Sequence, residues 1–143
     1  MKVMDKKVGF IGAGNMASAL ISGMINAGFK PENIIASSPG KDHLDLLSKK
    51  FGVQTSNINE LVFKESEVII FAVKPNILKT VLEEYKNFSS EEMLLISVAA
   101  GFKILDIEAI LASEDLDKLF EIKSDGTGQF DAVISNATDA IIL

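Results

Sequence analysis

The fold of this chain is predicted by one stretch near its start, Lys7-Val8-Gly9-Phe10-Ile11-Gly12-Ala13-Gly14-Asn15-Met16-Ala17. A strand-like apolar run leads there into the pattern G-x-G-x-x-A. Gly12 permits a tight turn, Gly14 lets the main chain approach a phosphate, and Ala17 lets the next helix pack closely on the sheet. Because that helix begins with free N–H groups and the positive end of a dipole, the pattern predicts a turn that binds a dinucleotide pyrophosphate. A glycine-rich connector in another α/β protein is the alternative.

A helix is expected after the turn, because small and apolar residues recur there at helical spacing. The residues expected on its buried face are Met16, Ala19, Leu20, Gly23, Met24 and Ala27. Asn15 would place a polar side chain at the mouth of the turn.

Strand-like runs alternate with helix-like segments through the rest of the chain, which is typical of a parallel sheet wrapped by crossover helices. The expected strands are residues 34–37, 53–55, 68–73 and 93–98. Two expected helices have apolar faces at Leu44, Leu47 and Phe51, and at Leu78, Val81, Leu82 and Tyr85. We expect Gly52 to end the first of them, and Asn57 and Asn76 to cap helices. The predicted fold class is therefore α/β, a doubly wound parallel sheet of the Rossmann type.

Composition excludes several classes of function. The 143 residues carry a net charge of −6, and the lysines are scattered, which argues against nucleic-acid partners. No apolar run is long enough for a membrane helix, and the first residues lack the apolar core of a signal peptide, so we expect a cytoplasmic protein with no membrane partner. Because the chain has no cysteine and one histidine, we expect no metal site. That histidine, His43, has polar neighbours and is expected at the surface rather than in catalysis.

The carboxyl end of the second expected strand bears on the choice of cofactor. In an open parallel sheet, ligands bind beyond the carboxyl ends of the strands. NAD-specific folds usually offer an acid to the ribose there, but this chain has Ser37-Ser38-Pro39-Gly40-Lys41. Since a 2′-phosphate could bind to Ser37, Ser38 and Lys41, we predict that the cofactor is NADP. NAD is the alternative cofactor. A plain Ser-Pro-Gly turn is the alternative.

Two further strand ends are candidates for the same crevice. In Ala72-Val73-Lys74-Pro75, the proline stops the strand and leaves Lys74 near the crevice, although a solvated lysine before a turn is as plausible. In Ala99-Ala100-Gly101, the small residues would let a flat nicotinamide ring approach the backbone, although close helix packing would need the same residues.

Together these segments resemble the amino-terminal cofactor domain of the pyrroline-5-carboxylate reductases. The resemblance covers about residues 6 to 112. Its motifs are Val8-Gly9-Phe10-Ile11-Gly12-Ala13-Gly14-Asn15-Met16-Ala17, Ala36-Ser37-Ser38-Pro39, Phe71-Ala72-Val73-Lys74-Pro75 and Ser97-Val98-Ala99-Ala100-Gly101.

The resemblance also implies roles for single residues. It assigns residues 11–16, which are Ile11, Gly12, Ala13, Gly14, Asn15 and Met16, to the pyrophosphate, and Ser38 to the adenosine ribose. It assigns Asn59 and residues 72–75 to the crevice, and Val98, Ala99 and Ala100 to the nicotinamide side. The assignment of Asn59 to the crevice stays open, because Asn57 lies close by and either asparagine could cap the helix.

The family's activity is the NAD(P)H-dependent reduction of 1-pyrroline-5-carboxylate to proline, in proline biosynthesis. The family adds a sixth strand and then a helical domain, which forms the dimer and completes the substrate pocket. We expect neither here, because residues 113–143 do not resemble the family. We therefore divide the chain into a dinucleotide-binding domain, residues 1–112, and a divergent tail, residues 113–143.

In the tail, helical spacing continues through Ile107, Ile110, Leu111, Leu116, Leu119 and Phe120, and residues 130–134 could form an edge strand. No catalytic residue can be assigned from the sequence, and a homo-oligomer remains open. The leading hypothesis is an oxidoreductase of this family, as a truncated or diverged chain that binds cofactor and whose turnover alone is uncertain. The alternatives are a non-catalytic NADP-binding module or remnant, and another NADP oxidoreductase such as a deazaflavin-linked reductase.

Overall fold

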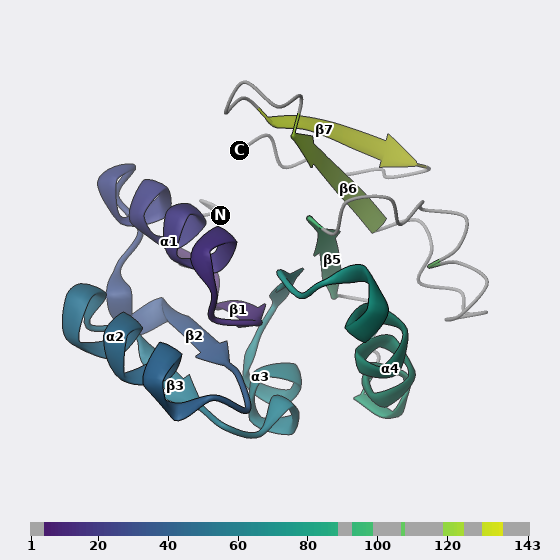
Figure 1. Ribbon diagram of the computed structural model, residues 1–143. Coiled ribbons are helices and arrows are strands. Elements are labelled where there is room, and N and C mark those ends of the chain that lie inside the picture. Colours follow the sequence, from purple (N-terminus) through teal and green to yellow (C-terminus); the bar gives the residue numbers. More distant parts are fainter. Residues whose placement is uncertain (1–4, 89–92, 99–106, 108–118, 125–129, 136–143) are drawn as a thin grey trace.

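A parallel sheet forms the centre of the molecule. The computed structural model describes residues 5–88, 93–98, 107, 119–124 and 130–135. Within them the strand order is β3-β2-β1-β4-β5-β6-β7, with β7 antiparallel to β6 and every other neighbouring pair parallel (Figure 1). The strands are β1 (Val8–Ile11), β2 (Ile34–Ser37), β3 (Gln54–Ser56), β4 (Val68–Phe71), β5 (Leu94–Ser97), β6 (Leu119–Ser124) and β7 (Phe130–Ser135).

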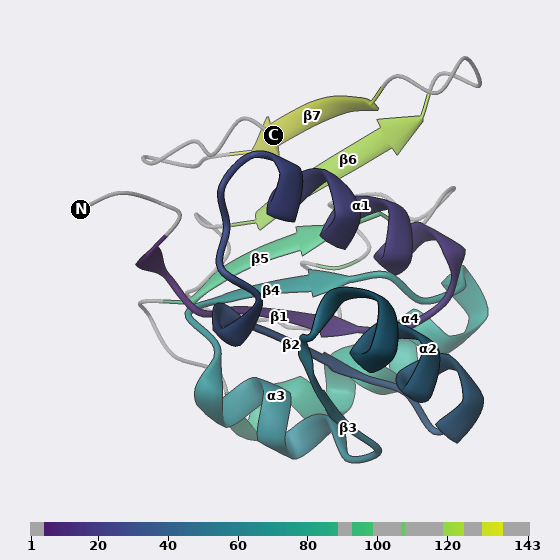
Figure 2. The same ribbon diagram turned by 90° about the vertical axis from the view of Figure 1, so that its left-hand side faces the viewer.

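Crossover helices cover both faces of this sheet (Figures 1 and 2). They are α1 (Asn15–Asn26), α2 (Lys41–Phe51), α3 (Asn59–Glu65) and α4 (Pro75–Tyr85), with short 3₁₀ turns η2 (Pro31–Asn33) and η3 (Lys86–Phe88). The core of one face includes α1 and α2, and the core of the other includes α3 and α4. The strand order 3-2-1-4-5-6 with helices on both faces is that of the Rossmann fold, so the predicted fold class is confirmed.

Strand β4 shows why the sheet is buried on both sides. Successive side chains of a strand point to opposite faces. Accordingly Val68 and Ile70 pack with α1 and α2, while Ile69 and Phe71 pack with α3 and α4. An uninterrupted apolar run is therefore what a central parallel strand requires. On the α4 side, the ring of Tyr85 lies edge-on to Phe71, at a centroid distance of 6.1 Å.

The buried face of α1 differs from the one predicted. Its buried residues are Ala17, Ile21 and Met24, whereas Ala19, Gly23 and Ala27 are exposed. The prediction was right for Met24, but the rest of the predicted face is wrong by one position, because Ala17, with no exposed surface, packs the first turn against the sheet. Met16 and Leu20 are only partly buried.

The predicted helix ends were right at α2 and wrong at two other helices. Gly52, at a φ of 73°, ends α2 in the left-handed conformation that favours glycine. Helix α3 begins at Asn59 with Ile58 as its N-cap, so Asn57 does not cap it. Helix α4 has Lys74 as its N-cap, and Asn76 lies inside it. Pro75 explains that start, since proline lacks an N–H and favours the first helical position.

Strand β6 corrects the expectation for the tail. Leu119 and Phe120, predicted at helical spacing, lie in this strand, which pairs in parallel with β5. A sixth parallel strand is therefore present where none was expected. The apolar residues Phe120 and Ile122 alternate with Glu121 and Lys123, and this period of two was the stronger signal. The predicted edge strand at residues 130–134 is confirmed by β7.

Other expectations for the tail fall outside the described residues, among them those on Ile110, Leu111 and Leu116. The division of the chain at residue 112 stays a prediction. Within the part of the chain that the structure describes, no helix is long and apolar enough to cross a bilayer.

Candidate functional site

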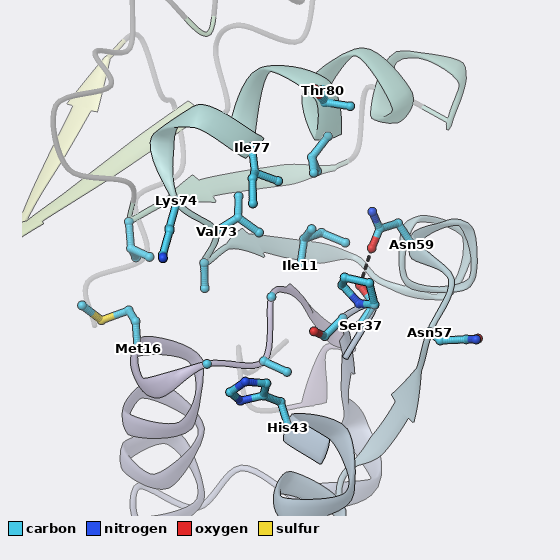
Figure 3. A pocket seen from close by; sticks show the side chains of 18 of the residues that line it. Ile11, Met16, Ser37, His43, Asn57, Asn59, Val73, Lys74, Ile77 and Thr80 are labelled. Carbon is cyan, nitrogen blue, oxygen red and sulfur yellow. Dashed lines mark hydrogen bonds between the residues drawn. The ribbon is translucent and has the colours of Figure 1, made fainter. Parts of the chain in front are cut away.

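A cleft of about 980 Å³ lies at the carboxyl ends of β1, β2, β4 and β5 (Figure 3). Main-chain hydrogen bonds beyond the strands hold these ends together. Gly12 N–H donates to the carbonyl of Ser37 at 2.8 Å, Ala72 N–H to Ile11 at 2.8 Å, and Val98 N–H to Phe71 at 3.1 Å. The four strand ends thus form one continuous floor, at the place where open parallel sheets bind ligands.

Most of the residues predicted from the sequence line this cleft. They are Ile11, Gly12, Ala13, Gly14, Asn15, Met16, Ser37, Ser38, Asn59, Ala72, Val73, Lys74 and Val98. Lys41 and Pro75 lie outside the lining, and Ala99 and Ala100 lie outside the described residues. The assignment of these residues to parts of a cofactor stays a prediction.

The two glycines of the turn have different physical roles. Gly12 has a φ of 110°, and a Cβ atom there would lie 2.3 Å from the carbonyl oxygen of Ala72. No other residue fits without moving the end of β4. Gly14 has an ordinary φ of −84°, and a Cβ atom there would meet nothing within 4 Å. Gly14 therefore keeps space open at the start of α1.

The start of α1 faces this open space. Gly14 is its N-cap, and no side chain among the described residues caps the helix. The first N–H groups of a helix have no partner within the helix, and they form an anion site together with the helix dipole. The turn and the helix start can therefore bind a phosphate through the main chain alone.

A chain of hydrogen bonds joins three elements at another part of the cleft. The hydroxyl of Ser37, in β2, donates to Oδ1 of Asn59 at 2.7 Å, and Nδ2 of Asn59 donates to Oε2 of Glu84, in α4, at 3.3 Å (Figure 3 draws the first bond). Ser37 has no exposed surface. Because Asn59 accepts on one side and donates on the other, the orientation of its amide is fixed. Asn59, in the first turn of α3, thereby links β2 to α4.

Ser38 and His43 lie beside this chain, around the turn between β2 and α2. The N–H of Gly40 donates to Oγ of Ser38 at 3.3 Å. His43 is exposed, as expected, and it also lines the cleft, which the sequence did not predict. Figure 3 shows its ring pointing from the start of α2 toward the glycine turn.

Helix α4 contributes lining residues that sequence reasoning missed. Ile77, Thr80, Val81 and Glu84 line the cleft from this helix, at the spacing i, i+3, i+4 and i+7. That stripe is visible in the sequence beside the core stripe of Leu78, Leu82 and Tyr85. Ile77 was the residue that best indicated this second stripe, because it is a large apolar side chain outside the core stripe.

The start of α3 and the turn after β2 add other missed residues, namely Pro39, Asn57 and Ile58. Ile58 and Ile77 are large apolar side chains that remain 56% and 45% exposed. Both line the cleft, so its exposed apolar surface is concentrated where a flat, partly apolar ligand could cover it.

Met16 and Lys74 lie at the other end of the cleft, away from Asn57 and Asn59 (Figure 3). Lys74 is exposed and brings a positive charge to the mouth of the cleft.

Among the described residues, no group of three or more His, Asp or Glu side chains could hold a metal ion.

Comparisons with known proteins agree with this geometry. The model of the family described as NADP oxidoreductase coenzyme F420-dependent matches residues 7–101. Pyrroline-5-carboxylate reductase of Methanosarcina acetivorans is 44% identical over 108 residues, which are 75% of this chain and 40% of that protein. The Arabidopsis thaliana enzyme of the same name is 35% identical over 138 residues, which are 94% of this chain and 49% of that protein.

A solved structure extends the likeness into the tail. Plasmodium falciparum pyrroline carboxylate reductase, solved with NADP bound, superposes with a TM-score of 0.80 at 29% identity and covers 97% of this chain and 52% of that one. This match and the Arabidopsis match both continue past residue 112, where the motifs of the resemblance stop. The resemblance itself is confirmed. The chain spans less than half the length of the curated relatives it matches.

Proposed function

This chain belongs to the NADP oxidoreductase family described as coenzyme F420-dependent, and we propose that its cleft binds NADP(H) for hydride transfer to a small imine, 1-pyrroline-5-carboxylate. The observation that carries the proposal is the glycine turn. It combines a position that only glycine fits, Gly12, with an open position, Gly14, directly before an uncapped helix. Relatives named pyrroline-5-carboxylate reductase support the substrate.

The lining residues fit a dinucleotide along its length. The turn and the start of α1 would hold the diphosphate, because a Cβ atom at Gly14 would stand in the space that a phosphate needs. Ile58 and Ile77 offer apolar surface to a base. Ser38, His43 and Asn59 offer polar groups to a ribose. Met16, Lys74 and Val98 remain for the nicotinamide end.

The cofactor, when bound, would supply the hydride, which is chemistry that no amino-acid side chain provides. The task of the chain is to fix the cofactor against the strand ends, so that one face of the nicotinamide meets the substrate. Lys74 would place its positive charge at the end of the cleft where an anionic substrate would approach. This role adds attraction and orientation without a proton transfer.

Calorimetric titration of the 143-residue chain with NADPH tests cofactor binding, and NADPH oxidation after addition of 1-pyrroline-5-carboxylate tests turnover. We expect saturable binding of one NADPH per chain. Absence of NADPH binding would contradict the proposal that the cleft is a cofactor site. Oxidation that depends on the imine would establish the reaction.

Two alternatives correspond to other outcomes of these assays. NADPH binding without imine-dependent oxidation would support a non-catalytic cofactor-binding module, in place of the proposed reductase. The description of the matching family favours a second alternative, reduction of a deazaflavin, so a deazaflavin belongs in the substrate panel. Oxidation of NADPH with the deazaflavin and not with the imine would replace the proposed substrate.

A further inference from the structure

We propose that Ser38 and His43 recognise the 2′-substituent of the adenosine ribose and make the cleft selective for NADP(H) over NAD(H). This inference rests on the proposed function, and it changes the assignment predicted from the sequence. That prediction gave the 2′-phosphate to Ser37, Ser38 and Lys41. The structure leaves only Ser38 of these three in a position to bind it.

Ser37 is unsuited to a phosphate because its hydroxyl proton is already in use. The side chain has no exposed surface, and its hydroxyl donates to Asn59 at 2.7 Å. A hydroxyl has a single proton to donate. To bind an anion, Ser37 would have to break a short hydrogen bond in the core of the domain and leave the oxygen of Asn59 without this donor.

Lys41 does not line the cleft, and the geometry of the helix gives the reason. Residues 41 and 43 are two positions apart in α2, and at 3.6 residues per turn their side chains diverge by about 200°. They therefore point to nearly opposite sides of the helix, and His43 is the one that lines the cleft. Lys41 is exposed at the first position of the helix.

Ser38 and His43 come together around Gly40. A Cβ atom built on Gly40 would lie 3.8 Å from Oγ of Ser38 and 3.5 Å from Cδ2 of His43, so both side chains border the same point. The hydroxyl of Ser38 accepts the N–H of Gly40 and keeps its proton for a ligand. An imidazole offers at least one N–H donor in either protonation state.

Charge also favours His43 for this role. Among the described residues that line the cleft, Lys74 is the one lysine, and it comes from the start of α4, across the cleft from His43 of α2 (Figure 3). Glu84 brings a negative charge to the wall formed by α4. His43 is therefore the basic side chain beside Ser38, and a hydrogen bond from its N–H to an anionic 2′-phosphate is stronger than one to a 2′-hydroxyl.

The test compares the affinities of NADPH and NADH for the 143-residue chain and its variants by calorimetry. We expect His43→Ala to weaken NADPH binding about tenfold and NADH binding less than about twofold, the loss typical of one charge-assisted contact. Ser38→Ala should act in the same direction with a smaller loss. His43→Lys, which places a donor with a positive charge at this position, should keep most of the preference for NADPH.

Lys41→Ala is the matched control, because it removes a nearby charge that does not line the cleft. Selective loss of NADPH binding in this variant, or equal loss of both nucleotides in His43→Ala, would overturn the inference. If the unchanged chain binds NADPH and His43→Ala binds it equally well, the inference fails and the proposed function stands. If the unchanged chain binds neither nucleotide, the inference and the proposed function are both contradicted. Denaturation midpoints show whether each variant is folded.

Discussion

The glycine turn and the Ser37–Asn59–Glu84 chain lie along one cleft but are built in different ways. Steric contacts of the main chain fix the turn, since a Cβ atom on Gly12 would lie 2.3 Å from the carbonyl oxygen of Ala72. Side-chain hydrogen bonds between β2, α3 and α4 fix the other region. The turn should therefore tolerate no substitution at Gly12. Substitutions in the hydrogen-bonded chain should each lower the stability of the domain by a smaller amount.

The largest effect is expected for Gly12→Ala. The methyl group would clash with main-chain atoms of Ala72 at 2.3 and 2.8 Å, and alanine disfavours a φ of 110°. We expect a loss of about 3 kcal/mol or more in the free energy of unfolding, measured by urea denaturation. Gly23→Ala is the control, because a Cβ atom there meets nothing within 4 Å, and alanine in a helix should stabilise by up to about 1 kcal/mol. Equal stability of the two variants would contradict the steric account.

Gly14→Ala separates binding from stability at the same turn. Its backbone conformation suits alanine, and the methyl group would extend into the open cleft. We expect an unfolding free energy within about 0.5 kcal/mol of the unchanged chain. Calorimetry should show NADPH binding at least about tenfold weaker, because the main chain could no longer approach the phosphate. Undiminished affinity would place the diphosphate elsewhere.

Asn59→Ala removes the middle of the polar chain. Ser37 would lose its short hydrogen bond within the core, so we expect a loss of about 1 to 3 kcal/mol in unfolding free energy. Asn57→Ala is the matched control, since Asn57 also lines the cleft but is exposed, and it should cost less than about 0.5 kcal/mol. Urea denaturation measures both. A larger loss for Asn57→Ala would show that the wrong asparagine has been assigned the structural role.

The smallest effect is expected for Glu84→Gln. Glutamine keeps an oxygen that can accept from Asn59, so the unfolding free energy should change by less than about 0.5 kcal/mol. Removing a negative charge from the cleft should tighten NADPH binding slightly, by about two- to fivefold at low salt, and the gain should fade as salt screens it. Titrations at two salt concentrations measure this. Weaker binding of NADPH to this variant would mean that the carboxylate itself is a ligand group.

The contrast between the two regions also explains what the sequence could predict. The turn is formed by consecutive residues, Gly12 to Ala17. Its steric requirements therefore appear in a short sequence motif. The fold class followed from the alternation of strands and helices in the same way. The polar chain joins residues 22 and 25 positions apart, and nothing near Ser37 indicates that its hydroxyl faces Asn59 rather than a ligand.

Other errors had equally specific causes. The sequence did not predict that His43 lines the cleft, because Lys41 and His43 both follow β2 closely and only the turn of α2 decides which of them faces it. In α1 the helical period was right and the phase was wrong, because Ala17 rather than Met16 packs on the sheet. In β6 a short helical spacing competed with an alternation of period two, and the alternation prevailed.

A crystal structure of the 143-residue chain grown with NADPH would test whether this cleft is the dinucleotide site. We predict that the diphosphate lies against the main-chain N–H groups at the start of α1, the base between Ile58 and Ile77, and the 2′-phosphate beside Ser38 and His43. A nucleotide bound away from the Gly12–Gly14 turn, or with its 2′-phosphate beside Lys41, would contradict it.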